Sequence, residues 1–372
     1  MKKIAIIGAG ISGLFFANLL KNNLDYDFTI FEKKTSINLD DGYGVQLSVN
    51  SIKLLNEIGF NNVDKTEIYN PKKINFINAK KNKNICTLDI SKYNYENNKY
   101  TTLKRSTLLK FLLDDIPKDK IKFDIQLQNI SYGKKLNLFF SENYMEQFDY
   151  LIVSDGVFSY TKSLILNKDI KPKYFNSLAL RGNINYYPNK DISLYFGSNF
   201  HFVIYPVNQK NEFNFILVIK KKLFDQKTYK NKTFLQSITK ELYKNTEVKL
   251  DGKLNNIKSF PIYISEQLDI SDKKNIFFVG DALFTMPPTF AQGASQSIES
   301  SKELFDQIQN NADFYYKKRI KKINSVKWRS KLNYFSFHLS NPLFIFLRNF
   351  ILKKLVNNNR FLDSYLGNIY RG

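Results

Sequence analysis

The sequence is poor in the residues that hold metals and form disulfides. It has one cysteine, Cys86, and two histidines among 372 residues. One cysteine excludes an internal disulfide and a thiolate metal cluster, and two histidines are too few for a usual zinc site. We therefore predict no metal and a reducing compartment, the cytoplasm. Cys86 is interpreted as a core or strand residue without a functional role.

Acidic residues are also scarce relative to basic ones. The 34 Asp and Glu residues oppose 56 Lys and Arg residues, which leaves a net charge of +22. Such a charge suits a nucleic acid, an anionic membrane or an acidic substrate. However, the lysines are spread along the chain, and no basic run is interleaved with stacking aromatic residues. We predict that the protein does not bind nucleic acid.

Long apolar runs are absent as well. Residues 343–356 are strongly apolar but carry Arg348, Lys353 and Lys354, and they fall short of the ~20 residues that a membrane span requires. They predict a packing or dimer helix in a monomer or homodimer, and a peripheral membrane contact is left open. The N-terminus mimics a signal peptide, with two lysines before an apolar run, but its glycine spacing argues otherwise.

The first 32 residues have the pattern of a dinucleotide-binding unit. Residues 3–7 are typical of a buried strand and residues 11–20 of a helix, and a second strand over 28–31 ends at Glu32. A GxGxxG motif lies between the first strand and the helix, at Gly8, Gly10 and Gly13. Glycines let the backbone approach a pyrophosphate at the helix N-terminus, and the carboxylate accepts the ribose hydroxyls. The unit does not distinguish NAD from FAD.

Two later strands end in a glycine and a carboxylate. Residues 149–154 (DYLIVS) precede Asp155 and Gly156, and residues 275–279 (NIFFV) precede Gly280 and Asp281. Each pair alone could be a turn in which the aspartate caps the next helix. Together with the first motif they indicate ligand contacts, because open α/β sheets bind ligands beyond the carboxyl ends of their strands.

With these motifs the chain resembles the class A flavoprotein monooxygenases, the single-component aromatic hydroxylases with the fold of p-hydroxybenzoate hydroxylase. The matching segments, in order, are GAGISG with Glu32, LKRSTLLKFL around Arg105, DYLIVSDGVFS and NIFFVGDALFTMPPTFAQGASQSIE. The resemblance covers nearly the whole chain. HxxxYP at residues 201–206 is similar to the salicylate and 3-hydroxybenzoate hydroxylase branch.

The resemblance implies an α/β fold. A Rossmann-like FAD-binding domain would carry an inserted, mostly antiparallel β-sheet substrate domain, with helices at the C-terminus. We expect the FAD-binding domain at residues 1–70, 97–165 and 272–330, the substrate domain at 71–96 and 166–271, and a C-terminal helical segment at 331–372.

The resemblance implies FAD as the cofactor and NADH or NADPH as the co-substrate. The residues expected to bind FAD are Gly8, Gly10, Ile11, Ser12, Gly13, Glu32, Lys33, Gly44, Val45, Arg105, Asp155, Gly156, Gly280, Asp281, Pro288, Gln292, Gly293 and Ala294. Met286, Pro287 and Pro288 would form a rigid wall beside the flavin ring. Gly42 and Gly44 resemble the mobile family loop that covers the flavin.

Strand-like runs from Ser177 onward are expected to form the substrate face. Alternation along HFVIYPV places His201, Val203 and Tyr205 on one face and Phe202 and Ile204 on the other. In the branch that the chain resembles, the histidine acts as a base toward the substrate phenol and the tyrosine orients it. Arg181 either pairs with a substrate carboxylate or anchors a strand end.

Three positions depart from the family pattern. Phe284 stands where most relatives have a histidine, which puts in doubt any role for a histidine in ordering that turn. Ala291 replaces a glycine found in many relatives, and Lys162 replaces an arginine, which keeps the charge but loses the fork geometry.

The predicted function is that of a FAD-dependent monooxygenase, which uses NAD(P)H and O2 to hydroxylate a small phenolic or aromatic acid through a flavin hydroperoxide. Two alternatives stay open. One is a ubiquinone-pathway ring hydroxylase, and the other, suggested by Phe284, is a flavin-binding protein without hydroxylase activity. The sequence decides neither the substrate nor the choice between NADH and NADPH.

Overall fold

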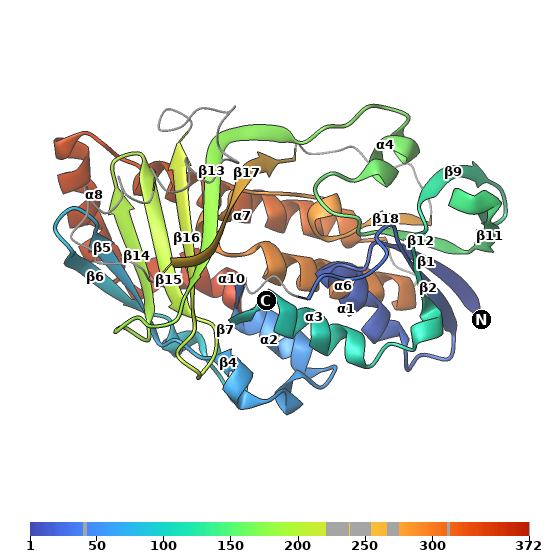
Figure 1. Ribbon diagram of the computed structural model, residues 1–372, viewed down its shortest axis with the longest axis horizontal. Coiled ribbons are helices and arrows are strands. Elements are labelled where there is room, and N and C mark those ends of the chain that lie inside the picture. Colours follow the sequence, from blue (N-terminus) through green and yellow to red (C-terminus); the bar gives the residue numbers. More distant parts are fainter. Residues whose placement is uncertain (40–42, 221–237, 239–253, 266–274, 311–312, 372) are drawn as a thin grey trace.

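The computed structural model describes residues 1–39, 43–220, 238, 254–265, 275–310 and 313–371. A parallel sheet lies at one end of the molecule and a large, mostly antiparallel sheet at the other (Figure 1). The long helices α6 (Gly293–Asn310) and α7 (Tyr315–Phe337) run between them. The site described below lies where these parts meet.

The parallel sheet has the strand order β18-β12-β1-β2-β8. Its strands are β1 (Lys2–Ile7), β2 (Tyr26–Glu32), β8 (Ile121–Phe123), β12 (Tyr150–Val153) and β18 (Ile276–Phe278). The apolar residues of β1, β2, β12 and β18 are largely buried, as expected for a parallel sheet covered by helices, whereas the edge strand β8 is half-buried to exposed. The predicted Rossmann-like unit is therefore confirmed.

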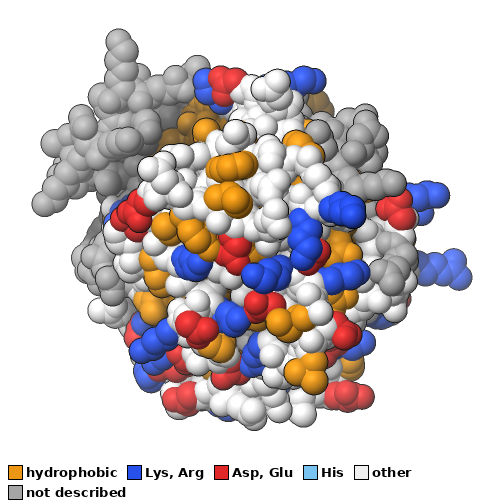
Figure 2. All heavy atoms as spheres, turned by 90° about the vertical axis from the view of Figure 1, so that its right-hand side faces the viewer, with side chains coloured by type: hydrophobic (Ala, Val, Ile, Leu, Met, Phe, Trp, Pro, Cys, Tyr) orange, Lys and Arg blue, Asp and Glu red, His pale blue; other side chains and the backbone are white. Residues whose placement is uncertain are grey.

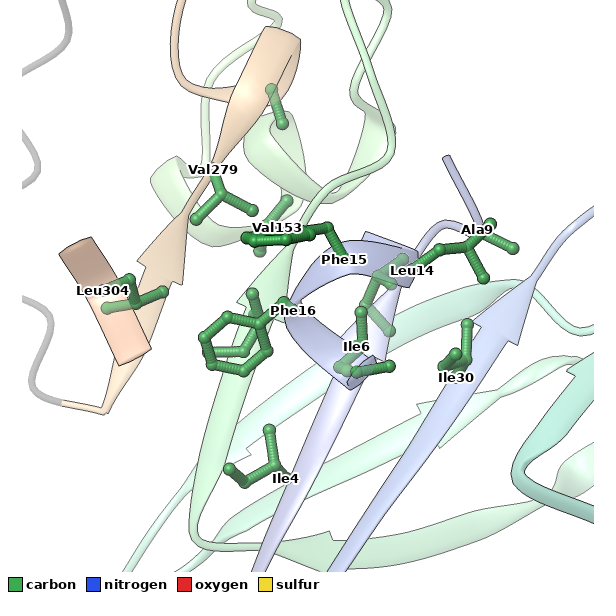
Figure 3. Packing of buried hydrophobic residues seen from close by; sticks show 14 of the residues in the cluster. Ile4, Ile6, Ala9, Leu14, Phe15, Phe16, Ile30, Val153, Val279 and Leu304 are labelled. Atoms are coloured by element: carbon green, nitrogen blue, oxygen red, sulfur yellow. The ribbon is translucent and has the colours of Figure 1, made fainter. Parts of the chain in front are cut away.

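The core of this half lies between the sheet and its helices. Figure 3 shows Ile4, Ile6 and Val153 of the sheet packed against Leu14 and Phe16 of the helix α1. Besides α6, this half contains the short helices α1 (Ile11–Leu20), α2 (Val49–Asn56), α3 (Arg105–Asp114) and α4 (Tyr160–Leu166).

Helix α6 is buried on nearly all sides although it is rich in serine. The Ser301 hydroxyl donates to the carbonyl of Ser12 at 3.0 Å, and the Gly280 amide donates to the Ser300 hydroxyl at 3.1 Å. Small hydroxyl side chains let α6 approach its neighbours closely while their polar atoms stay hydrogen-bonded. The middle of α6 is thereby fixed against the first turn of α1 and against Gly280.

The second large sheet has the order β17-β13-β16-β15-β14-β5-β6, and all its pairs are antiparallel except β14 with β5. Its strands are β5 (Lys73–Asn78), β6 (Lys83–Asp89), β13 (Lys173–Ile184), β14 (Ile192–Gly197), β15 (Phe200–Pro206), β16 (Phe213–Lys220) and β17 (Leu254–Ile264). Cys86 is a half-buried residue of β6.

The remaining strands form two small antiparallel sheets. One joins β9 (Leu127–Tyr132), β10 (Leu136–Phe140) and β11 (Met145–Phe148), and the other joins β3 (Gly44–Leu47), β7 (Thr101–Lys104) and β4 (Ile68–Tyr69). The predicted α/β fold with a mostly antiparallel second sheet is confirmed.

The chain closes with helices. After α7 come α8 (Pro342–Leu355), α9 (Asn359–Leu362) and α10 (Asn368–Tyr370). Helix α7 runs unbroken through residues 330 and 331, the expected start of the C-terminal segment, and the division into domains stays a prediction. Among the described residues, no helix has both the length and the apolarity needed to cross a membrane.

Candidate active site

The glycine-rich loop follows β1 and begins α1. Gly8 has φ +102°, a conformation that favours glycine, and a Cβ on Gly13 would lie 2.2 Å from the Gly8 carbonyl oxygen. The Ser154 hydroxyl, at the end of β12, donates to that oxygen at 2.9 Å. A Cβ on Gly10, in contrast, would meet only one atom, at 4.0 Å. The loop is thus packed tightly at Gly8 and Gly13 and is open at Gly10.

Glu32 lies beside this loop, at the end of β2. One carboxylate oxygen accepts the amide of Ala9 at 2.9 Å, and the other accepts the amide of Lys34 at 3.0 Å. Lys33 is exposed, whereas Ser12 is buried and Ile11 half-buried. The structure therefore brings the glycines and the carboxylate together, as the spacing predicted.

The strand ends with Asp155 and Asp281 lie next to the glycine loop, because β12 pairs with both β1 and β18. Gly156 and Gly280 have φ of +86° and +58°, and a Cβ on Gly280 would lie 2.6 Å from the Ser12 hydroxyl. One oxygen of Asp155 accepts the Thr161 amide at 3.2 Å, while the buried Oδ1 has no hydrogen-bond partner among the described residues. Burial raises the pKa of Asp155.

Lys162 and Arg105 set the electrostatics around Asp281. Desolvation of the carboxylate by the surrounding protein raises the pKa of Asp281 to about 6, and the positive charges of Arg105 and Lys162 oppose that rise. The side chain is nevertheless open to water, because it faces a hollow rather than packed atoms. Lys162 is itself buried, which lowers its pKa, and Asp155 and Asp281 counteract that shift. The Lys162 ammonium therefore interacts electrostatically with both aspartates.

The turn with Phe284 is ordered without a histidine. Phe284 is buried in the core, and its amide donates to the Gly280 carbonyl at 3.1 Å. The next residue, Thr285, donates its amide to the Ser265 hydroxyl at 2.6 Å and accepts the Ser265 amide at 3.2 Å. Apolar packing and backbone bonds thus take the place of an imidazole here.

The wall after this turn is fixed to α7. The Ser330 hydroxyl donates to the Pro287 carbonyl, and the Thr289 hydroxyl donates to the Ser330 carbonyl. Met286, Pro287 and Pro288 all line the hollow. The Gly293 and Ala294 amides lie in the first turn of α6, where helical amides lack partners within the helix. Gln292 is buried, and its Nε2 has no hydrogen-bond partner among the described residues.

Ala291 corrects one expectation from the sequence. Ala291, Ala294, Ile298 and Phe305 stand at spacings of three, four and seven in the sequence, which predicts that all four belong to the following helix. However, α6 starts at Gly293. Ala291 instead has φ +51° and ψ 32°, in the left-handed region. The Cβ makes that conformation unfavourable for alanine, whereas glycine adopts it without strain.

We expect Ala291→Gly to raise the free energy of unfolding by about 0.5–1 kcal/mol, because glycine relieves the left-handed strain. Ala294→Gly, in the first turn of α6, should instead lower it, by less than the roughly 1 kcal/mol that glycine costs in a helix interior. Urea denaturation of both variants measures the two changes. A loss of stability in Ala291→Gly would contradict the strained conformation.

A cavity of about 750 Å³ joins these residues to the large antiparallel sheet. Its wall is mainly apolar and comes from four parts of the chain. These are the β3 strand with Gly44 and Val45, the sheet with Arg181, His201, Val203 and Tyr205, the segment from Asp281 to Ala294, and the C-terminal helices from Leu332 to Tyr370. Six of the residues predicted to bind FAD line this cavity together with Arg181, His201 and Tyr205; they are Gly44, Val45, Asp281, Pro288, Gly293 and Ala294. The glycine-rich loop, Glu32, Arg105 and Asp155 are not part of its lining.

The alternation predicted for β15 is confirmed. His201, Val203 and Tyr205 line the cavity, while Phe202 and Ile204 pack in a separate core cluster on the other face. Burial raises the pKa of Tyr205, against the positive charge of Arg181. Arg181 itself lies on β13, between β16 and β17.

His201 is paired with the only other histidine of the chain. Its Nδ1 lies 2.7 Å from Nε2 of His338, so one of the two rings must be the donor. Burial lowers the pKa of His201 to about 3 and also lowers that of His338, so both rings are neutral at pH 7. The nitrogen of His201 left for a ligand is Nε2. Sequence reasoning missed His338, for which the count of two histidines was the only signal.

Arg348 is a second missed residue. It lies on α8, is buried, lines the cavity and has its guanidinium 4.4 Å from the centre of the Phe196 ring. It donates to the Ser336 carbonyl at 3.1 Å and to the Asn349 side chain at 2.8 Å, and burial lowers its pKa to about 10. An arginine in the middle of an apolar run was the available signal.

The structure leaves no space for a side chain at Gly44. A Cβ there would lie 2.7 Å from side-chain atoms of Asn214 and Val207 and 2.8 Å from Tyr205, and the Gly44 amide donates to Asn214 at 2.7 Å. The strand with Gly44 and Val45 is therefore held directly against the sheet. Gly42 lies outside the described residues.

The residues present fit an FAD. The open face at Gly10, the unpartnered Oδ1 of Asp155 and the unpartnered Nε2 of Gln292 are polar or open sites that a dinucleotide with a flavin ring would occupy. The N-termini of α1 and α6 both point at this region, which suits a pyrophosphate and the pyrimidine edge of a flavin. The described residues contain no cluster that could hold a metal ion.

Comparison with known proteins agrees with this geometry. Residues 6–40 match the NAD(P)-binding Rossmann-like domain family. A 3-amino-4-hydroxybenzoate 2-monooxygenase of Streptomyces platensis is 22% identical over 91% of this chain and 89% of its own. A 6-hydroxynicotinate 3-monooxygenase of Bordetella bronchiseptica is 21% identical over 81% of each chain.

Solved structures share the fold. Klebsiella pneumoniae HpxO, complexed with FAD and uric acid, superposes with a TM-score of 0.86 at 16% identity, over 98% of this chain and 97% of that one. A salicylate hydroxylase substrate complex gives 0.80 at 16% identity, over 100% and 95%. The chain therefore has the fold of the class A flavin-dependent aromatic monooxygenases and has its sequence relatives among them, as the motifs predicted.

Proposed function

We propose that this chain binds FAD and uses NADH or NADPH and O2 to hydroxylate a small phenolic or other aromatic acid. One observation carries the proposal, namely the single cavity of about 750 Å³ that Asp281, Pro288 and Gly293 share with Arg181, His201 and Tyr205. The relatives support the substrate class, since their names specify a hydroxybenzoate and a hydroxynicotinate.

The reaction balances without a further reactant. NAD(P)H, a proton, O2 and the aromatic ring give NAD(P)+, the hydroxylated ring and water. When bound, FAD supplies the transfer of electrons from the nicotinamide to O2 and the delivery of one oxygen atom to the ring. The mainly apolar cavity wall offers few polar groups that could hold water around that exchange.

The cavity residues suit an aromatic acid. Arg181 and Arg348 are the cations among its described lining, and guanidinium groups match carboxylate geometry. His201 is neutral because burial lowers its pKa, so its Nε2 can accept the proton of a phenol. The phenolate so formed stabilises the imidazolium by its opposite charge and thereby offsets the cost of burial.

The test is NADH and NADPH oxidation by the FAD-loaded protein with a panel of hydroxybenzoates, aminohydroxybenzoates and hydroxynicotinates. We expect one member to stimulate oxidation and to give a product with one added oxygen atom. Hydrogen peroxide is measured in parallel, since oxidation that yields only peroxide is uncoupled. Retained FAD with no stimulated oxidation across the panel would refute the proposal, and the alternative of a flavin-binding protein without hydroxylase activity would then stand.

His201→Asn should lower the rate of coupled hydroxylation by roughly 10²–10⁴-fold, the usual contribution of a general base. His338→Asn is the matched control, because that residue contacts His201 but is not among the residues that line the cavity. His338→Asn should lower the rate of coupled hydroxylation less than His201→Asn does, and it should shift the pH dependence of that rate. FAD affinity, measured by flavin fluorescence, should change in neither variant. Equal rates in His201→Asn and the parent would exclude His201 as the base.

A further inference from the structure

Helix α8 is turned with its apolar side outward. The side chain of Phe346 is 66% exposed, and the buried residue of the helix is Arg348. The exposed apolar residues of α8 are Leu343, Phe344, Phe346, Leu347, Phe350 and Ile351. An unpaired apolar surface of this kind on a folded protein usually marks an interaction site.

Helix α7 adds an apolar stripe to this surface. Trp328, Leu332 and Phe335 follow a spacing of four and three residues, so they share one face of α7, and all three are exposed. The Arg348 guanidinium holds α8 to α7 through the Ser336 carbonyl. Together with the six α8 residues, these three form a surface that we term the α7–α8 face. The cavity borders this face, because five of the nine residues also line it, namely Leu332, Phe335, Phe344, Leu347 and Ile351.

The segment of the chain that forms the α7–α8 face carries charge of one sign. Residues 314–362 contain eight lysines and four arginines and no aspartate or glutamate. Lys321 and Lys331 lie on the exposed side of α7 with Trp328, and Lys353 and Lys354 end α8. The Lys354 ammonium lies 4.5 Å from the centre of the Phe350 ring. Cations thus border the apolar residues without an acidic neighbour in this segment.

The opposite end of the molecule differs. Figure 2 shows the face at the parallel sheet, where basic and acidic side chains alternate and apolar ones are scattered. Several of the cations there are paired, as in Lys3 with Glu146, Lys120 with Asp27, and Lys135 with Asp149. On α7, Lys318, Arg319 and Lys322 are likewise paired with Glu299 and Glu303 of α6. Lys321, Lys331, Lys353 and Lys354, in contrast, form no ion pair with a described residue, and it is these four cations that border the apolar residues of α7 and α8.

We propose that the α7–α8 face docks the protein reversibly on an anionic lipid bilayer, with α8 lying in the plane of the interface. At 14 residues, α8 is about 21 Å long, too short to span a bilayer. Its phenylalanines and leucines reach the acyl boundary while the lysines meet anionic headgroups. A second copy of the chain fits less well, because it would oppose two faces of the same positive charge. The proposal does not depend on the enzymatic activity.

The experiment is flotation of the full-length, FAD-loaded protein with vesicles of phosphatidylcholine alone or mixed with phosphatidylglycerol. We expect binding to the mixed vesicles and much weaker binding to the neutral ones. Raising the salt from about 0.1 M to about 1 M, which shortens the Debye length from about 10 Å to about 3 Å, should release the protein. Equal binding to both vesicles, or none to either, would overturn the proposal.

The double variant Phe346→Asp/Phe350→Asp should weaken vesicle binding by roughly tenfold or more, because both side chains leave the acyl boundary. The matched control, Leu24→Asp/Met145→Asp, adds the same charge at exposed apolar positions near the parallel sheet and should bind like the parent. Equal losses in both variants would mean that net charge alone drives binding. A parent that dimerises without binding vesicles, and becomes monomeric in Phe346→Asp/Phe350→Asp, would identify a second copy as the occupant; either result overturns the proposal.

Discussion

Gly13→Ala should destabilise the protein by about 3 kcal/mol and abolish FAD binding. The new Cβ would lie 2.2 Å from the Gly8 carbonyl oxygen and 3.2 Å from the Ile6 side chain. The clash involves the backbone of the loop that follows β1, so α1 must move away from this loop. Overpacking of this kind costs the upper end of about 1–3 kcal/mol. Urea denaturation of the apoprotein and flavin fluorescence titration measure the two effects.

Gly10→Ala is the matched control in the same loop. Gly10 has φ −87°, which alanine adopts freely, and the nearest protein atom to a Cβ would be 4.0 Å away. The apoprotein should therefore keep or gain stability, by about 0.5 kcal/mol. FAD affinity should still fall roughly tenfold to a hundredfold, because the methyl group occupies the side of the loop that a pyrophosphate approaches. Unchanged FAD affinity in Gly10→Ala would mean that this loop does not hold the cofactor.

The parts of the fold that follow a local pattern could be predicted from the sequence. The first strand, the helix over 11–20 and the strand ending at Glu32 appear within two residues of their expected bounds. Each is encoded by a short apolar run, a glycine constraint or a helical period within its own segment. The alternation of His201, Val203 and Tyr205 was predictable for the same reason.

What the sequence could not give is the pairing of distant residues. His201 meets His338, which lies 137 positions later, only because the end of α7 packs on the large sheet. Arg348 enters the cavity because α8 turns the side with Arg348, Leu352 and Leu355 inward, whereas a cation in the apolar run 343–356 is expected to face solvent. The left-handed conformation of Ala291 is equally invisible, since alanine is a good helix former and local propensity favours extending α6 through it.

The buried charges beneath α6 also depend on a distant contact. Arg319 of α7 is completely buried and lies 3.3 Å from a Glu303 carboxylate oxygen and 3.7 Å from one of Glu299. It donates to the Gln296 side-chain oxygen at 2.7 Å, and Gln296 in turn donates to Gln292 at 3.1 Å. This chain of contacts links α7 to the first turn of α6, where a flavin edge would lie.

Arg319→Met should lower the free energy of unfolding by about 3 kcal/mol, because it keeps Glu299 and Glu303 buried while removing their shared cation. Lys318→Met is the matched control. It removes another partner of Glu303, at 3.5 Å, but its side chain is 61% exposed, so the loss should be about 0–1 kcal/mol.

Two measurements separate the ion pair from simple packing in the Arg319→Met protein. Adding Glu303→Gln should recover part of the lost stability, because it removes one of the stranded charges. FAD affinity should fall in Arg319→Met and not in Lys318→Met, since only the former frees Gln296 and with it the position of Gln292. If Arg319→Met unfolds at the same urea concentration as the parent, the buried pair contributes no net stability, and burial of that guanidinium must then be balanced by packing alone.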